Sequence, residues 1–154
     1  MKAMILAAGL GRRLAPLTNR TPKPLLPIAG EPLLVRQIRQ LNRAGYNDIV
    51  INLHHLGEQI TATLGDGNGL GVNIQYSHED ILLDTGGGIV RALPKLGDAP
   101  FMVLNGDILT DFDFTDLPTA FTPDTLGHLV VTEKPARRDH GDFNVGNQRI
   151  TERG

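Results

Sequence analysis

The stretch LAAGLGRRLAPLTNRTPKPLLP, residues 6–27, directly follows a short apolar run at residues 3–6 and organises the rest of the chain. Gly9 and Gly11 permit a tight turn without Cβ atoms, in which successive backbone N–H groups can point at one anion. Positive charge comes from nearby basic side chains, namely Arg12, Arg13 and Lys23. Because open α/β folds bind nucleotides in loops at the C-terminal ends of strands, the stretch predicts a phosphate-binding loop after a first strand.

Two common phosphate-binding motifs do not fit this stretch. The dinucleotide fingerprint G-x-G-x-x-G would need a third glycine at position 14, which is Leu14. The P-loop needs G-K-S or G-K-T, and the chain contains neither tripeptide. Lys23 instead lies between Pro22 and Pro24, whose rings fix φ at about −65° and so limit the freedom of the backbone near the ammonium group. The alternative interpretation is a Gly/Pro-rich surface loop with solvated cations.

The composition is that of an ordinary globular protein. Of the 154 residues, 40% are hydrophobic and 21% are charged, which fits one domain with one buried core. The formal net charge of −2 predicts neither a nucleic-acid-binding surface nor a polybasic membrane patch. The absence of cysteine excludes disulfides, thiolate zinc sites and cysteine nucleophiles. No apolar run has the length of a signal peptide or a membrane span, and we expect a cytoplasmic protein.

The pattern of apolar residues predicts strands that alternate with helices. Helical spacing and Gly/Pro boundaries predict helices from Pro32 to Gly45, over residues 58–64, and from the glycines at 86–88 to Pro94. Short apolar, alternating or β-branched runs predict strands at residues 2–7, 48–53, 72–77, 101–104 and 128–132, with a small hairpin at 143–150. This alternation predicts an α/β fold, a Rossmann-like three-layer α/β/α architecture with a mostly parallel central sheet, in a single domain over residues 1–154.

The step Asn105-Gly106-Asp107 directly follows the predicted strand 101–104. Its aspartate is expected at the C-terminal end of the sheet beside the glycine loop, where a magnesium ion bridging substrate phosphates needs an oxygen ligand. An aspartate after Asn-Gly is also a common turn residue. Asn105 projects to the same face of the strand and could hydrogen-bond a sugar.

The glycine cluster DTGGG at residues 84–88 allows two compatible interpretations. It can be a simple helix start with Thr85 as the N-cap. The missing side chains can also let a flat nucleobase lie against the backbone, whose N–H and C=O groups then bond to its edge.

The sequence G-L-G-R-R-L-A-P-L-T at residues 9–18, followed by P-K-P at 22–24, resembles the sugar-1-phosphate nucleotidyltransferases. Their signature has the form G-x-G-x-R-[LM]-x-P-L-T, then P-K-P, and the match extends over residues 1–30. The signature requires glycines, an arginine, a lysine and prolines at set spacings, so a match by chance is improbable. The resemblance implies the fold of the nucleotide-diphospho-sugar transferases and transfer of a nucleotidyl group from a nucleoside triphosphate to a sugar 1-phosphate, with release of pyrophosphate.

The resemblance also implies roles for individual residues. The catalytic residues would be Arg13, Lys23 and Asp107, with Asp107 as a ligand of the cofactor Mg²⁺. The nucleotide would contact Leu6, Ala7, Ala8, Gly9, Gly11, Arg12, Arg13, Lys23, Thr85, Gly86 and Gly87. The sugar phosphate would contact Asn105, Glu133, Gly141 and Asp142. Surface solvation explains Glu133 equally well, because that part of the family pattern is the weakest here.

Within the family, several segments are similar to the bacterial N-acetylmuramate-1-phosphate uridylyltransferases of cell-wall recycling. These segments are TPKPLLPIAG, IVIN, LGDG, TGGG, RALP, LGDAPF and the N-G-D step. The mannose-1-phosphate guanylyltransferases share much of this pattern and are the nearest alternative. The partners expected from the resemblance are therefore UTP and a sugar 1-phosphate, with N-acetylmuramate 1-phosphate as the first choice.

Family members continue past the equivalent of Gly154 and add strands and a second metal-binding aspartate. We therefore expect the chain to be incomplete at its C-terminus and inactive by itself for lack of that aspartate. An alternative of another class is a non-catalytic, nucleotide-binding regulatory relative. The presence of Arg13, Lys23 and Asp107 argues against it, since a pure binder needs no lysine at the transferred phosphorus.

Overall fold

The computed structural model describes residues 1–147 and 149–153. The chain groups into two compact units, Met1–Thr119 and Ala120–Gly154. Among the described residues, the strands of each unit pair with strands of the same unit. The single domain expected over residues 1–154 stays a prediction.

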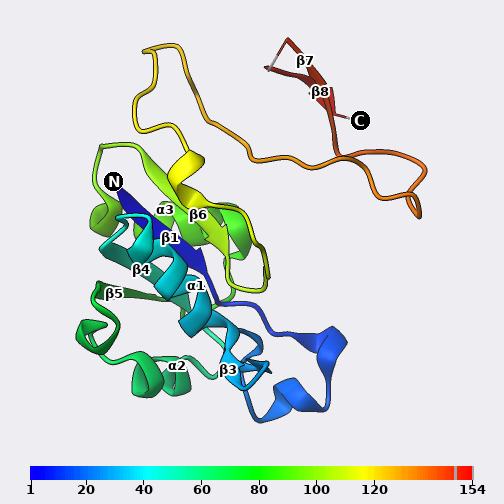
Figure 1. Ribbon diagram of the computed structural model, residues 1–154. Helices are drawn as coiled ribbons and strands as arrows, with labels where there is room; N and C mark the ends of the chain where they lie inside the picture. The colour runs from blue at the N-terminus through cyan, green and yellow to red at the C-terminus, as the bar shows by residue number, and fades with distance from the viewer. Residues whose placement is uncertain (148, 154) are drawn as a thin grey trace. The chain divides into compact units, whose positions relative to one another are not determined.

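The centre of the first unit is a parallel sheet made of β1 (Lys2–Leu6), β4 (Asp48–Leu53), β5 (Asn73–His78) and β6 (Phe101–Asn105). The order β5-β4-β1-β6 places the first strand of the chain inside the sheet (Figure 1). Met4 of β1 is in register with Val50 of β4 and Val103 of β6. Because all four strands are parallel, their C-terminal ends meet at one edge of the sheet.

Three helices cover the two faces of this sheet: α1 (Leu33–Arg43), α2 (Gly57–Leu64) and α3 (Asp84–Leu96). Ile38 of α1 and Ile60 of α2 belong to the same buried cluster as Ile5 of β1. Ala92 of α3 packs in a second cluster with Met4, the neighbouring residue of β1. Successive strand residues point to opposite faces, so β1 is buried on both sides. The predicted three-layer α/β/α architecture with a parallel sheet is confirmed.

Short elements connect these layers. The chain between β1 and α1 contains one-turn 3-10 helices and a two-residue hairpin, and α1 then begins directly after Pro32. These elements are η1 (Arg12–Leu14), η2 (Leu17–Asn19), η3 (Lys23–Leu25), β2 (Pro27–Ile28) and β3 (Glu31–Pro32), and two further turns are η4 (Asn68–Leu70) and η5 (Phe114–Asp116).

Helix α3 differs from its prediction at both ends. It begins at Asp84, so the glycines 86–88 lie inside it, and Thr85 is not its N-cap. The N-cap residue is Leu83, which makes no side-chain capping bond, and its backbone N–H donates to the carboxylate of Glu79. Pro94 does not end the helix, because it lies in the last turn, where the loss of one N–H still lets the chain continue to Leu96.

The second unit contains one hairpin, β7 (Phe143–Gly146) and β8 (Arg149–Arg153), which confirms the hairpin predicted at 143–150. The strand predicted at 128–132 is wrong, because those residues form no ladder. Leu129, Val130 and Val131 have the composition of a strand but stay about half exposed, since within the described residues no neighbouring strand bonds to this segment. Apolar composition favours an extended chain, and a partner strand is needed to make it a sheet.

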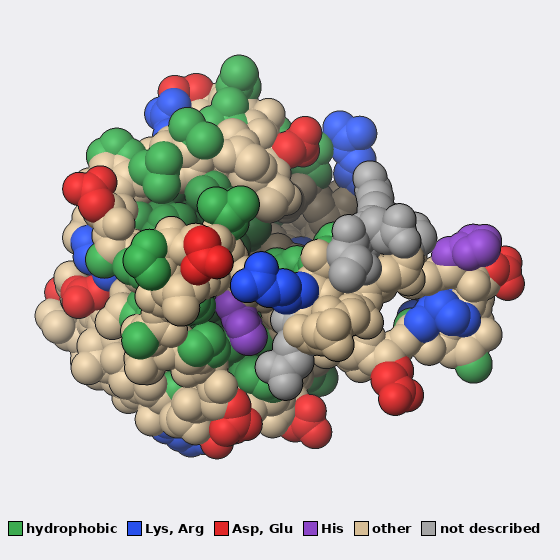
Figure 2. Space-filling model, turned by 90° about the horizontal axis from the view of Figure 1, so that it is seen from above, with side chains coloured by type: hydrophobic (Ala, Val, Ile, Leu, Met, Phe, Trp, Pro, Cys, Tyr) green, Lys and Arg blue, Asp and Glu red, His purple; other side chains and the backbone are tan. Residues whose placement is uncertain are grey.

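Exposed hydrophobic side chains stand among polar and charged ones at the surface (Figure 2). In the first unit they include Val90 and Leu93 of α3 and Val103 of the edge strand β6. Among the described residues, no helix combines the length and the apolar character needed to cross a membrane.

Candidate functional site

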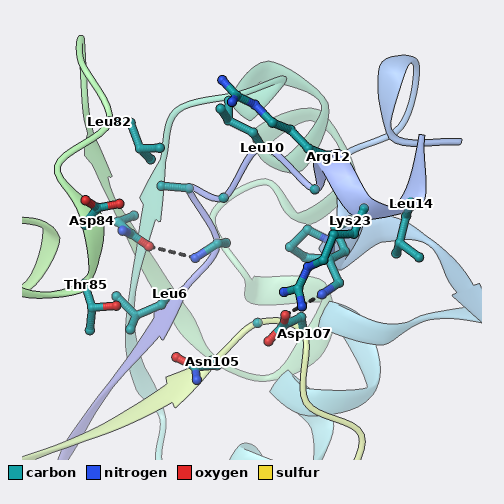
Figure 3. A pocket seen from close by; sticks show the side chains of 18 residues that line it. Leu6, Leu10, Arg12, Leu14, Lys23, Leu82, Asp84, Thr85, Asn105 and Asp107 are labelled. Carbon is teal, nitrogen blue, oxygen red and sulfur yellow. Dashed lines mark hydrogen bonds and ion pairs between the residues drawn. The ribbon is translucent and has the colours of Figure 1, made fainter. Parts of the chain in front are cut away.

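A cavity of about 400 Å³ opens at the C-terminal ends of the parallel strands, entirely within the first unit (Figure 3). It lies where β1 and β6 end and where helix α3 begins. The residues that line it are Leu6, Ala7, Ala8, Gly9, Leu10, Gly11, Arg12, Arg13, Leu14, Lys23, Pro24, Asn52, Leu82, Asp84, Thr85, Asn105, Gly106 and Asp107. Most of the residues predicted to bind nucleotide or metal are therefore brought together, from segments far apart in the sequence.

The glycine loop after β1 is anchored by Thr18. Gly11 has φ of 63°, in the left-handed region that favours glycine, and a Cβ atom there would lie 2.7 Å from Cγ2 of Thr18. The hydroxyl of Thr18 donates to the Gly11 carbonyl at 2.9 Å, and His55 Nε2 lies 3.1 Å from the Thr18 carbonyl. Gly9, by contrast, has open space where a Cβ would be. The loop is thus fixed at its base and open toward the cavity at Gly9.

Three basic side chains reach this cavity. Arg12 and Arg13 line it, and neither forms an ion pair within the part of the chain that the structure describes. Lys23 donates from Nζ to Oδ2 of Asp107. Figure 3 shows the Lys23 and Asp107 side chains pointing toward one another. The cavity therefore combines two unpaired guanidinium groups with one ammonium group that a carboxylate holds.

Asp107 is positioned by close contacts at the end of β6. The N–H of Gly106 donates to the Leu6 carbonyl at 2.8 Å, and a Cβ on Gly106 would lie only 2.8 Å from that same oxygen. The approach of these two strand ends therefore needs glycine. It places Asp107 beside the glycine loop, as the predicted common edge of the strands requires.

Gln37 of α1 holds the same turn from the other side. Its Nε2 donates to the carbonyl oxygens of Asn105 at 3.0 Å and of Ile108 at 2.7 Å, on either side of Asp107. The side chain is 1% exposed. Sequence reasoning missed this residue, although a signal was present, since Gln37 stands three residues after Leu34 on the apolar face of the helix.

The wall formed by the start of α3 contains Leu82, Asp84 and Thr85. Of the predicted base-contacting residues, Thr85 lines the cavity, whereas Gly86 and Gly87, in the same first turn of α3, do not. Their contact with a base stays a prediction. Sequence reasoning also missed Asp84 as a residue of the cavity. It is the first residue of α3, and its φ is 55°.

Two buried polar residues at the cavity were not predicted either: Asn52, which lines it, and Glu79, which bonds to Asn52 from behind. Asn52 bonds to the backbone of Ala7 and to Glu79, and Glu79 bonds in turn to the backbone of Leu83. The available signal was a single asparagine inside the apolar strand DIVINL.

Three predicted sugar-contacting residues belong to the second unit, namely Glu133, Gly141 and Asp142. Asp142 forms an ion pair with Arg138 at 3.2 Å within that unit. Asn105, the fourth predicted sugar contact, lines the cavity of the first unit. The contact of all four with a sugar stays a prediction.

The residues at the cavity fit a magnesium ion held partly by substrate. Among the described residues, no three His, Cys, Asp or Glu side chains gather in a metal-binding cluster. Mg²⁺ is commonly held by one or two carboxylates together with substrate phosphates and water, rather than by a complete protein cage. The Asp107 carboxylate at the cavity, 40% exposed, is a donor of the kind that such an ion takes.

A protein-family model described as "Nucleotidyl transferase" matches residues 2–149. The N-acetylmuramate alpha-1-phosphate uridylyltransferase of Neisseria meningitidis serogroup B is 50% identical over 149 residues, covering 94% of this chain and 64% of that protein. The mannose-1-phosphate guanylyltransferase of Mycobacterium tuberculosis is 39% identical over 115 residues, covering 75% of this chain and 32% of that protein. The chain thus spans less than two thirds of the length of these relatives.

The fold of about three quarters of the chain's length is also found in a solved structure. The crystal structure of a putative glucose-1-phosphate thymidylyltransferase from Bacillus anthracis, in complex with sucrose, superimposes with a TM-score of 0.70 and 30% identity. The match covers 75% of this chain and 47% of that protein.

Proposed function

Because the chain belongs to the nucleotidyl transferase family, we propose that it transfers a uridylyl group from UTP to a sugar 1-phosphate, with N-acetylmuramate 1-phosphate as the preferred acceptor. The products are a UDP-sugar and pyrophosphate, and the role is the recycling of bacterial cell-wall sugars. The choice of uridylyl transfer is supported by the 50% identity to the Neisseria uridylyltransferase, against 39% to the mycobacterial guanylyltransferase.

One observation carries the proposal. The cavity brings the loop of Gly9 and Gly11, the guanidinium of Arg13, the ammonium of Lys23 and the carboxylate of Asp107 to one edge of the sheet. Backbone N–H groups and cations are the groups that bind a triphosphate, and a carboxylate beside them suits its magnesium ion.

In the reaction that we propose, an oxygen of the sugar 1-phosphate attacks the α-phosphorus of UTP. A new P–O bond forms there as the bond to the β-phosphate breaks, and pyrophosphate leaves with the electron pair. The phosphate oxygen is already a nucleophile, so no serine, cysteine or histidine nucleophile is required. The protein has to align two polyanions and to neutralise the charge that moves to the leaving group.

The residues divide these tasks. The Gly9 and Gly11 loop and Arg13 would hold the β- and γ-phosphates, and Lys23 would lie near the α-phosphate and the incoming oxygen. Asp107 would hold Mg²⁺, which neutralises phosphate charge when bound. Asn105 would orient the sugar.

A matrix of substrates tests the choice of base and sugar. The protein, expressed from the full reading frame of its gene, is incubated with Mg²⁺, with each of UTP, GTP, dTTP and ATP, and with each of N-acetylmuramate, mannose and glucose 1-phosphates. The value of kcat/KM is measured from pyrophosphate release. We expect the highest value for UTP with N-acetylmuramate 1-phosphate. A higher value for GTP with mannose 1-phosphate would overturn the substrate assignment and leave the reaction class intact.

A further inference from the structure

A buried pair of side chains joins two walls of the cavity: Asn52 at the end of β4, 3% exposed, and Glu79 just after β5, 5% exposed. Oδ1 of Asn52 accepts from the backbone N–H of Ala7 at 2.7 Å, and its Nδ2 donates to Oε1 of Glu79 at 2.8 Å. The other carboxylate oxygen, Oε2, accepts from the N–H of Leu83 at 3.0 Å. A continuous chain of hydrogen bonds therefore runs from Ala7 to Leu83.

The sheet does not need this pair. Burial of an amide and a carboxylate is unfavourable unless each polar atom finds a partner. The ladder between β4 and β5 is formed by backbone groups, and β4 is otherwise apolar from Ile49 to Leu53. An apolar residue at position 52 would suit the strand, but it would leave the Ala7 N–H without this partner. The pair therefore serves mainly to fix the backbone at Ala7 and at Leu83, the two positions that it joins.

Helix α3 packs directly on the pair. A Cβ atom on Gly88 would lie 2.8 Å from both Nδ2 of Asn52 and Oε1 of Glu79, so the helix backbone approaches as closely as a glycine allows. On its other side, the backbone of Glu79 is fixed by Leu53, whose carbonyl accepts its N–H at 2.8 Å, and by Nδ1 of His54 at 2.8 Å. The carboxylate is thus held between the sheet and α3.

The two ends of this hydrogen-bond chain belong to different walls. Ala7 begins the glycine loop, whereas Leu83 precedes Asp84 and Thr85 at the start of α3. Figure 3 shows Leu82, Asp84 and Thr85 on one side of the cavity and Leu14 and Lys23 on the other. Under the proposed function, the first wall holds the triphosphate and the second faces the base.

We propose that Asn52 and Glu79 are positioning residues that hold these two walls at the separation that a nucleoside triphosphate requires. The inference rests on the proposed function and adds to it the means by which the protein fixes the shape of its nucleotide site. Both polar ends of Asn52 are already bonded within the protein, so the pair acts through Ala7 and Leu83.

An exchange of the two functional groups gives a sharp test. Asn52→Asp puts two carboxylates against one another, and Glu79→Gln removes one of the two acceptors, so each single change breaks the hydrogen-bond chain. The double variant Asn52→Asp/Glu79→Gln rebuilds it with reversed polarity. The new carboxylate then accepts from Ala7 N–H and from the new amide, whose oxygen accepts from Leu83 N–H.

The variants are compared by calorimetric titration with UTP in the presence of Mg²⁺, by steady-state kinetics and by thermal unfolding. Each single variant should lose about tenfold or more in UTP affinity, and the KM for UTP should rise more than kcat falls. The double variant should return to within about threefold of the unsubstituted protein. Single variants that unfold at lower temperature but bind UTP normally when folded would overturn the inference, as would a folded double variant that shows no recovery.

Two further measurements keep the inference separate from the proposed function. Gly88→Ala, whose Cβ would push on both side chains, should weaken UTP binding, whereas Gly69→Ala, exposed with open space around its Cβ, should not. If the protein binds UTP but releases no pyrophosphate, the proposed function fails and the binding data still decide the inference. If the protein binds no UTP, amide hydrogen exchange at residues 7–11 and 83–87 decides the inference. Faster exchange in the single variants, with recovery in the double variant, supports the inference. Unchanged exchange overturns it.

Discussion

The ammonium of Lys23 and the carboxylate of Asp107 form an ion pair at the cavity, although 84 positions separate them in the chain. The pair joins the Pro-Lys-Pro segment to the end of β6. Its side chains stay 28% and 40% exposed, so a substrate phosphate or a metal ion can reach both groups. In the proposed reaction the two partners separate, with Lys23 turning to phosphate and Asp107 to Mg²⁺.

The pair should contribute little to stability. Exposed ion pairs are typically worth about 0–1 kcal/mol, because water screens them and the side chains lose freedom. We therefore expect Lys23→Met and Asp107→Asn each to change the free energy of unfolding by less than about 1 kcal/mol, measured by urea denaturation. A loss of several kcal/mol would mean that the pair serves the fold.

Loss of the ammonium should affect turnover far more. Lys23→Ala removes a donor to the transferred phosphate, and we expect kcat to fall by about two to three orders of magnitude, measured by pyrophosphate release. The matched control is Lys95→Ala, since Lys95 lies outside the cavity, and its kcat should stay within about twofold. Near-normal turnover of Lys23→Ala would contradict the role of Lys23.

Asp107 should set the dependence on magnesium. In the proposed reaction, chelation by EDTA abolishes turnover and added Mg²⁺ restores it. Asp107→Asn loses the charge of the ligand, so the Mg²⁺ concentration for half-maximal rate should rise about tenfold or more. A Mg²⁺ titration of both proteins checks this, and identical curves would exclude Asp107 as a ligand.

Gln37 should support the same carboxylate from a distance. Gln37→Leu removes the side-chain donor to the carbonyl oxygens of Asn105 and Ile108, of which that of Asn105 keeps the bond from the N–H of Ile108 at 3.2 Å. We therefore expect a loss of about 1–3 kcal/mol in unfolding free energy and a higher Mg²⁺ concentration for half-maximal rate. The control is Gln59→Leu, which loses one exposed bond to the Arg20 carbonyl and should cost less than about 1 kcal/mol. Equal losses of unfolding free energy in the two variants, measured by urea denaturation, would show that Gln37 does not hold the turn around Asp107.

The two glycines of the loop should tolerate alanine differently. Gly11 has positive φ and lies against Thr18, so Gly11→Ala should destabilise the protein by about 1–3 kcal/mol. Gly9 has open space and no positive φ, so Gly9→Ala should stay within about 1 kcal/mol of the unsubstituted protein. Thermal unfolding of both variants tests the difference, and the reverse order would contradict the loop geometry.

The sequence predicted those elements whose pattern is local and strong. The strand DIVINL and the helix of Leu34, Ile38 and Leu41 follow from apolar periodicity, and the glycine loop follows from its own motif. The strand expected at 128–132 failed, because a ladder depends on a partner that the local pattern does not report.

The site residues divide in the same way. The positions of Lys23 and Asp107 at the cavity could be predicted, because the motif and the end of the strand mark them, and their roles stay predictions. Gln37 and Asn52 bond to the backbone of distant segments, and Glu79 bonds to the side chain of Asn52 on the neighbouring strand. Nothing in the sequence next to these residues identifies those partners. A polar residue inside an apolar pattern was the signal available for Gln37 and Asn52.

The most direct test of nucleotidyl transfer is phosphorus NMR of a reaction that contains Mg²⁺, UTP, N-acetylmuramate 1-phosphate and the protein expressed from the full reading frame of its gene. We expect pyrophosphate and the diphosphate of a UDP-sugar to appear in equal amounts as both substrates disappear. If UTP binds but its spectrum stays unchanged, or if orthophosphate alone is released, nucleotidyl transfer is contradicted. The first of these outcomes would favour a nucleotide-binding regulatory protein.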